Sequence, residues 1–285
     1  MQLPHLMAIL NVTPDSFSDG AQFATPDEAV SHGMRLAREG AHAIDVGGES
    51  TRPGAERVSV AEQIDRVVPV ISKLRPMLDG AGFGHVTLSI DTTRAAVAQA
   101  ALDAGARLVN DVSAGEEDPE LFPLVAKTGA RICLMHRQGT PETMQKAPTY
   151  GDVLIEVRNY LLARAQAAQQ AGIPHSRIWL DPGIGFGKTF NHNIMLMKEL
   201  PEFVATGYPI LLGASRKRWI AEVMAGQSAV EANDRLGGSI AASLWAAQCG
   251  VAVVRVHDVA PHVQALAALQ AIRNACNGSP IKGFD

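Results

Sequence analysis

The chain has 285 residues, of which 47% are hydrophobic and 19% are charged, and its formal net charge is −4. This hydrophobic fraction excludes a disordered chain, and the mild negative charge without a lysine-rich run argues against a general nucleic-acid binder. The three cysteines are too few and too scattered for a disulfide framework or a zinc site. The first residues lack the basic region of a signal peptide, so we predict a cytoplasmic protein.

One uncharged stretch, residues 236–254, approaches the length that spans a membrane. It is rich in Gly, Ala and Ser and is interrupted at Gly250. We therefore predict a buried helix followed by a strand, and no contact with a membrane.

Eight short hydrophobic runs without polar alternation recur along the chain. They cover residues 6–10, 43–46, 86–90, 108–112, 131–135, 177–180, 209–212 and 252–256. Such runs are typical of strands buried on both faces of a parallel sheet. Helical patterns lie between them, at residues 26–40, 95–103, 153–170, 220–225, 240–248 and 261–274. The first of these begins with Thr25 as N-cap and Pro26 at the first helical position.

The alternation of strands and helices favours a (β/α)8 barrel, a TIM barrel, over an open doubly wound sheet. No linker-like stretch divides the chain, so we predict a single domain over residues 1–285. Polar residues follow every predicted strand at its carboxyl end: Asn11, Asp45, Asp91, Asn110, His136, Asp181, Ser215 and Arg255. In a barrel these ends share one rim, where active sites are built, so the pattern favours an enzyme.

The loop at residues 183–189, GIGFGKT, ends like a phosphate-binding Walker loop. Pro182 stands where that motif needs its first glycine, and proline has no N–H to offer a phosphate. The glycines instead indicate a close approach between backbone and ligand.

The rim residues have complementary chemistry. Two carboxylates, Asp91 and Asp181, and the amide of Asn110 suit a flat heterocycle that carries N–H and NH2 donors. Cations at three strand ends, Arg52, Lys217 and Arg255, suit an anionic ligand. The sequence has no pair of His or Cys residues at the spacing of a zinc site, such as His-x-x-x-His or Cys-x-x-Cys. A Mg²⁺ ion, in contrast, needs few protein oxygens besides substrate phosphates, and Asn11 can supply one.

Together these rim segments resemble the dihydropteroate synthase family. The similarity runs in order through residues 11–20 (NVTPDSFSDG), 45–54 (DVGGESTRPG), 89–92 (SIDT), 110–113 (NDVS), 134–136 (LMH), 181–188 (DPGIGFGK), 215–217 (SRK) and 255–258 (RVHD). The first two segments are long and specific, and the short ones are convincing as part of the series.

The resemblance implies a transferase of folate biosynthesis, the target of sulfonamides, that joins a dihydropterin diphosphate to 4-aminobenzoate. It implies that the pterin is held by Asp91, Asn110, Asp181 and Lys217, with Arg255 against its face. It places Mg²⁺ and the diphosphate at Asn11, Thr51, Arg255 and His257, and aminobenzoate at Thr51, Arg52, Pro53, Phe186, Ser215 and Lys217. It also implies a homodimer, and loops after the first two strands that close over the site.

Among these residues, we expect Asp91, Lys217, Arg255 and His257 to act on the reacting groups. Two alternatives remain open from the sequence. The chain could be a pterin-dependent methyltransferase domain of similar architecture, or a pterin-binding paralogue without catalytic activity.

Overall fold

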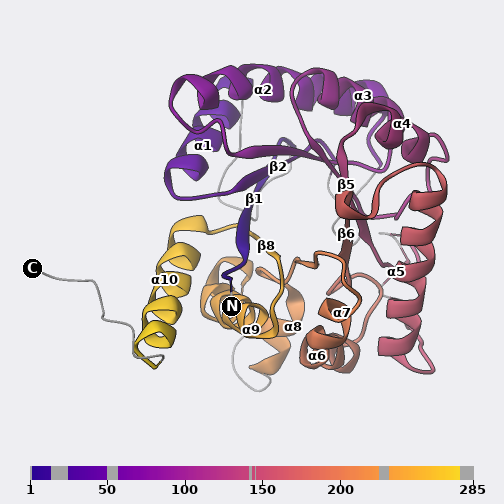
Figure 1. The fold of residues 1–285 in the computed structure, drawn as a ribbon, viewed down its shortest axis with the longest axis vertical. Helices are drawn as coiled ribbons and strands as arrows, with labels where there is room; N and C mark the ends of the chain where they lie inside the picture. Colours follow the sequence, from indigo (N-terminus) through magenta and orange to yellow (C-terminus); the bar gives the residue numbers. More distant parts are fainter. Residues whose placement is uncertain are drawn as a thin grey trace, which may run out of the picture.

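The computed structural model describes residues 2–13, 25–49, 57–140, 143–144, 146–224 and 231–276. Strands alternate with helices along these ranges, and the helices form an outer ring around the strands (Figure 1). The strands are β1 (His5–Asn11), β2 (Ala43–Gly47), β3 (Thr87–Asp91), β4 (Leu108–Asp111), β5 (Arg131–Met135), β6 (Ile178–Asp181), β7 (Leu211–Leu212) and β8 (Val253–Val256). The α-helices are α1 (Pro26–Arg38), α2 (Val60–Gly80), α3 (Ala95–Asp103), α4 (Leu121–Thr128), α5 (Val153–Gln170), α6 (Phe190–Lys198), α7 (Leu200–Val204), α8 (Arg218–Val223), α9 (Leu236–Cys249) and α10 (Val259–Cys276). Two 3₁₀ turns, His175–Arg177 and Ala232–Arg235, complete the described elements.

The eight strands pair in the order β6-β5-β4-β3-β2-β1-β8-β7, and every pair is parallel. A further parallel bridge joins Leu180 in β6 to Ile210, which lies just before β7. This bridge joins the two ends of the sheet order. The predicted (β/α)8 barrel is therefore confirmed, and the alternative of an open doubly wound sheet is wrong.

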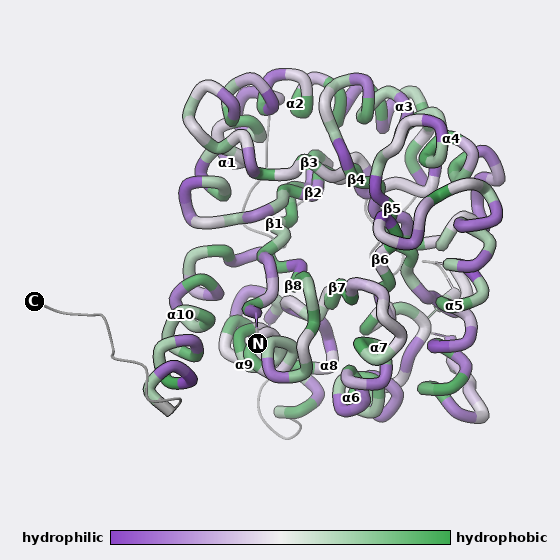
Figure 2. Tube along the Cα trace, viewed as in Figure 1, coloured by the Kyte–Doolittle hydropathy of each residue, from purple (hydrophilic) through white to green (hydrophobic). Residues whose placement is uncertain are grey.

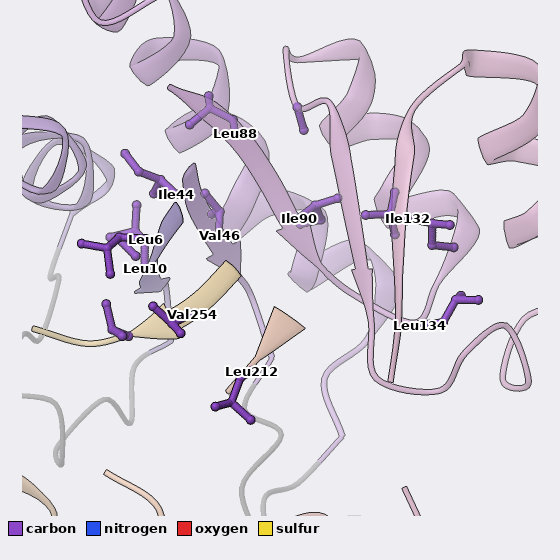
Figure 3. Packing of buried hydrophobic residues seen from close by; sticks show 14 of the residues in the cluster. Leu6, Leu10, Ile44, Val46, Leu88, Ile90, Ile132, Leu134, Leu212 and Val254 are labelled. Atoms are coloured by element: carbon purple, nitrogen blue, oxygen red, sulfur yellow. The ribbon is translucent and has the colours of Figure 1, made fainter. Parts of the chain in front are cut away.

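The outward-facing side chains of the strands form the main hydrophobic core. Alternate residues such as Leu6, Leu10 and Val46 are buried against the surrounding helices (Figure 3). Hydrophobic and hydrophilic stretches alternate along those helices, as an amphipathic helix on a barrel requires (Figure 2). Because side chains alternate between the two faces of a strand, the remaining residues of each strand point into the barrel.

The interior of the barrel is apolar at one end and polar at the other. Its apolar end is a separate cluster of residues from the amino-terminal halves of the strands: Met7, Ala43, Leu108, Cys133, Leu211 and Val253. Two residues further along their strands lie Ile9, Asp45, Asn110 and Arg255. The apolar layer thus supports a polar layer at the carboxyl ends, where the site is expected.

Most element bounds agree with the sequence prediction to within about two residues. The helices α3 and α5 and the strand β5 match it fully, and Thr25 caps α1 in a capping box with Glu28. Residues 236–254 form a helix followed by a strand, as predicted. Within the described residues, no helix is long and apolar enough to cross a membrane. The single domain over residues 1–285 stays a prediction.

Four helices were not predicted: α2, α4, α6 and α7. The longest, α2, contains Pro69 and Pro76, which lack the N–H of a helical hydrogen bond and normally interrupt a helix. Its buried residues Val67, Val70, Ile71, Leu74 and Leu78 nevertheless recur at helical spacing, and Ser59 caps its first turn. Burial of this face against the barrel therefore outweighs the local cost of the two prolines.

Candidate active site

A cavity of about 560 Å³ lies at the carboxyl ends of the strands. Its lining contains every sequence-predicted site residue that the structure describes: Asn11, Asp91, Asn110, Asp181, Phe186, Ser215, Lys217, Arg255 and His257. The structure thus brings together nine residues that are spread over almost 250 positions of the chain. Thr51, Arg52 and Pro53, and the predicted closing loops after β1 and β2, lie outside the described residues.

A hydrogen-bonded charge network forms one wall of the cavity. Asp45 Oδ2 accepts a bond of 2.8 Å from Asn110 Nδ2 and one of 2.7 Å from Arg255 Nε. The other side of the same guanidinium donates from Nη2 to Asp91 Oδ2 at 2.9 Å. One arginine therefore bridges two buried carboxylates and, through Asp45, fixes the orientation of the Asn110 amide.

This network changes the expected electrostatics of the rim. Because Arg255 is paired with both carboxylates, it adds less positive potential than the sequence analysis assumed. Burial raises the pKa of Asp91 above its usual value, and the neighbouring Asp45 raises it further, while Arg255 opposes both effects. Asp91 is thus a carboxylate whose charge depends on its pairing with Arg255.

Asp181 lies across the barrel from this network, at the end of β6. Its Oδ1 accepts the backbone N–H of Gly183 at 2.7 Å. Burial raises the pKa of Asp181 to about 6, although the Gly183 bond and the cations Lys217, Lys188 and Arg255 favour the ionised form. Near neutral pH, Asp181 is therefore a largely ionised acceptor in the cavity.

The glycine at position 183 is required by the backbone. It has φ +69°, in the left-handed region, and an added Cβ would lie only 1.9 Å from the carbonyl oxygen of His136. The loops after β5 and β6 therefore touch at this point, and no side chain fits there.

The opposite side of the cavity combines a cation with an aromatic ring. Lys217 Nζ lies 4.0 Å from the centre of the Phe186 ring, in a cation–π contact. Ser215 Oγ lies 3.0 Å from His257 Nδ1. Burial and the nearby cations Arg216 and Arg255 lower the pKa of His257 to about 3, so its imidazole is neutral near pH 7. His257 can therefore bind an anion as a hydrogen-bond donor but not as a cation.

Asn11 lines the cavity at the carboxyl end of β1. It ends β1 in register with Gly47 of β2, which in turn pairs with Asp91 of β3. A Cβ on Gly47 would lie 3.3 Å from Asn11 Oδ1 and 3.6 Å from Asp91 Cβ, so the glycine lets these two side chains pack closely against the strand. Within the described ranges, no group of three or more His, Cys, Asp or Glu side chains could hold a metal ion. A single amide oxygen in an open cavity fits Mg²⁺, which keeps several waters and shares substrate phosphates.

Two residues of the site were not assigned by the sequence analysis. Asp45 was noted only as a strand end, although a charged residue within a hydrophobic strand, two positions before the strand end, must face the interior polar layer. Lys188 was set aside with the Walker-like loop, yet it lines the cavity and is only 2% exposed. Both are buried charges, and their roles become visible only through their contacts.

Comparison with known proteins decides the family. The family described as pterin binding enzyme matches residues 7–257. The dihydropteroate synthase of Mycobacterium leprae is 49% identical over 264 residues, which cover 92% of this chain and 90% of that protein. The chain belongs to the dihydropteroate synthase family.

Solved structures of this family share the fold. The dihydropteroate synthase of Yersinia pestis in a sulfonamide drug complex is 41% identical, with a TM-score of 0.88 and 95% of each chain covered. That of Xanthomonas albilineans with 4-aminobenzoic acid is 44% identical, with a TM-score of 0.85, covering 95% of this chain and 94% of that one. The chain is thus an enzyme of the transferase class, and the two alternatives raised from the sequence are disfavoured.

Proposed function

We propose that this chain condenses 7,8-dihydropterin-6-ylmethyl diphosphate with 4-aminobenzoate to give 7,8-dihydropteroate and diphosphate. The observation that carries the proposal is the convergence of Asp91, Asn110, Asp181 and Lys217 on one cavity. Family membership at 49% identity to a named synthase supports the same reaction.

The pterin ring would bind at the charged inner end of the cavity. A 2-amino-4-oxo ring presents adjacent N–H and NH2 donors, and an ionised carboxylate accepts two such hydrogens side by side. Asp181 is suited to this role because it is buried and largely ionised near neutral pH. Asp91 and Asn110 would contact the opposite edge of the ring, with Arg255 against its face.

The diphosphate would lie between the rim of β1 and the rim of β8. Asn11 supplies an amide oxygen for Mg²⁺, and His257 and Arg255 supply hydrogen-bond donors on the other side. When bound, Mg²⁺ would neutralise charge on the diphosphate oxygens and so favour their departure. Thr51, which follows β2 in sequence, would complete this contact.

The aminobenzoate would occupy the outer part of the cavity. Phe186 and Lys217 form a stacked apolar and cationic surface there, and Ser215 lies beside it with a hydroxyl that can donate to a carboxylate. Thr51, Arg52 and Pro53 would close this subsite. A sulfonamide would compete for the same place, since the Yersinia pestis relative was solved in a complex with such a drug.

The reaction needs no covalent nucleophile from the protein. The bond between the methylene carbon and the diphosphate oxygen breaks, and both electrons leave with the oxygen. The positive charge spreads into the electron-rich dihydropterin ring, where the carboxylate of Asp91 stabilises it. The aromatic amine is neutral at pH 7, so its lone pair forms the new carbon–nitrogen bond directly, and its extra proton passes to solvent or to diphosphate. Exclusion of water protects the cation until the amine attacks.

A two-substrate turnover assay tests the proposal. Purified protein should release diphosphate only when the pterin diphosphate, 4-aminobenzoate and Mg²⁺ are all present, and a sulfonamide should inhibit competitively with aminobenzoate. Absence of aminobenzoate-dependent release would reject the proposal. Tight pterin binding without turnover would instead select the non-catalytic paralogue.

Two further properties are proposed, the first from the family resemblance and the second from the sequence. We propose a homodimer, which light scattering of the purified protein would detect at twice the chain mass of 30.2 kDa. We also propose a cytoplasmic location, which is consistent with the free thiols of Cys133 and Cys249.

A further inference from the structure

Lys188 is a buried ammonium group that the proposed mechanism does not use. Its side chain is 2% exposed and lines the cavity. Among the described residues, Nζ donates to the carbonyl oxygens of Phe186 at 3.0 Å and His136 at 3.3 Å, and it lies 2.9 Å from His136 Nδ1. All three acceptors are neutral groups, since burial and the adjacent Lys188 lower the pKa of His136 to about 3.

A buried charge without a carboxylate in direct contact is costly, because neutral dipoles replace its hydration only in part. Burial lowers the pKa of Lys188 to about 7, whereas the charge of Asp181 favours the ammonium form. The effect is reciprocal, and Lys188 favours the ionised form of Asp181. Five other titratable groups interact with this pair: Lys217, Arg255, His136, His192 and the buried thiol of Cys133.

The contacts of Lys188 also connect two loops of the site. His136 follows β5, and Phe186 belongs to the loop after β6, so the single ammonium holds one loop against the other. The same two loops touch at Gly183, and the Phe186 ring carries the contact with Lys217. Lys188 therefore acts on the pterin acceptor Asp181 through its charge, and on the aromatic surface of the aminobenzoate subsite through its hydrogen bond to the Phe186 carbonyl.

We propose that Lys188 is a positioning residue for the condensation: its buried ammonium holds Asp181 in the ionised form that accepts the pterin N–H groups and fixes the Phe186 loop. This inference rests on the proposed function, since it assigns Asp181 to the pterin. The geometry separates two contributions. The charge acts on Asp181 through space, and the hydrogen bonds act on Phe186 through the backbone.

The charge contribution has a distinct pH dependence. Replacing Lys188 by Met removes a positive charge beside a buried carboxylate, so the pKa of Asp181 rises, and pterin affinity is lost at a higher pH than in the wild type. A nearby opposite charge shifts a carboxyl pKa by about one pH unit or more, so we expect the acidic limb to move up by about one unit. At pH 9 the wild-type Lys188 is itself neutral, so the affinities of the two proteins should differ by only a few-fold.

The experiment measures the dissociation constant of 6-hydroxymethyl-7,8-dihydropterin by titration calorimetry from pH 5 to pH 9. This ligand lacks the diphosphate, so phosphate titration does not enter the profile. The proteins are the full-length wild type, Lys188→Met, Lys188→Arg and, as a matched control, Lys127→Met on the exposed side of α4. Lys188→Arg keeps a charge at every pH, so it should retain the acidic limb of the wild type.

A loss of affinity in Lys188→Met that is equal at every pH would overturn the proposal, because a purely structural role has no preferred pH. If Lys188→Met does not fold, Lys188→Arg decides: an acidic limb that coincides with that of the wild type supports the proposal, and an acidic limb shifted up by about one pH unit despite the retained charge overturns it. Failure of the proposed function is recognised separately. In that case the wild type releases no diphosphate with aminobenzoate, whatever the pH profile of pterin binding.

Discussion

The substitution Asp45→Asn isolates the charge of the network that orients the pterin site. Asp45 is fully buried, and its Oδ2 accepts both network bonds, whereas Oδ1 has no hydrogen-bond partner among the described residues. An asparagine that places its carbonyl oxygen at the Oδ2 position keeps both bonds. The negative charge is removed while both bonds are kept, and the new NH2 group takes the buried Oδ1 position, where the structure describes no hydrogen-bond partner.

The size of the effect follows from the two bonds. A hydrogen bond to a charged group is worth roughly 1 kcal/mol more than a neutral one, so the two bonds lose about 2 kcal/mol together. If the two bonds hold Asn110 and Arg255 in the orientation that the transition state needs, losing this energy should lower kcat/KM for the pterin diphosphate about 30-fold. On folding, the lost bond strength is offset because a buried carboxylate no longer has to be desolvated. Stability should therefore change less than activity does.

The assay is steady-state turnover with varied pterin diphosphate, together with thermal unfolding of the same samples. Asp65→Asn, an exposed aspartate on α2, is the matched control and should leave both quantities unchanged. Asp45→Ala removes both acceptors, so the Asn110 amide and the Arg255 Nε–H lose their partner and the loss should exceed that of Asp45→Asn. A folded Asp45→Asn protein with kcat/KM within threefold of the wild type would refute this account of the network.

Three further perturbations test other parts of the account. Gly183→Ala should lower kcat/KM about 100-fold, because its Cβ would collide with the His136 carbonyl and displace the loop after Asp181. The control Gly207→Ala is also at positive φ, but no atom lies within 4 Å of the added Cβ, so turnover should stay near the wild-type value. Equal kinetics in the two variants would contradict the steric argument. Leu74→Ala, in the buried face of α2, should lower the free energy of unfolding in urea by about 2–5 kcal/mol. The exposed Met77→Ala should lower it by about 0.5 kcal/mol or less, and similar losses in the two variants would show that α2 does not contribute to core packing. Asn11→Ala should raise the Mg²⁺ concentration for half-maximal turnover about tenfold or more, and an unchanged metal titration would remove Asn11 from the metal site.

The sequence predicted the barrel well because its signal is redundant. Each strand is a continuous hydrophobic run, each is followed by a polar residue, and helices separate them, so an error in one element does not change the architecture. One of these runs, residues 131–135, has the same bounds as the observed strand β5. Even the two-residue strand β7 was located, although a bridge at Ile210 supplies part of its pairing.

The missed elements have identifiable physical causes. The helix α2 was not predicted, and it continues through Pro69 and Pro76 because its buried face packs on the barrel. The missed site residues, Asp45 and Lys188, have roles that depend on contacts between segments distant in sequence. Asp45 bonds to a residue 210 positions away, and Lys188 bonds to one 52 positions away. No local pattern specifies such pairings, so only the structure reveals them.

A crystal structure of the protein with the pterin diphosphate and Mg²⁺ tests the central claim most directly. The account predicts the ring N–H and NH2 groups within about 3.2 Å of the Asp181 carboxylate, its opposite edge against Asp91 and Asn110, and the diphosphate between Asn11 and His257. A pterin bound elsewhere on the barrel, or bound in this cavity with Asp181 turned away from it, would contradict the account.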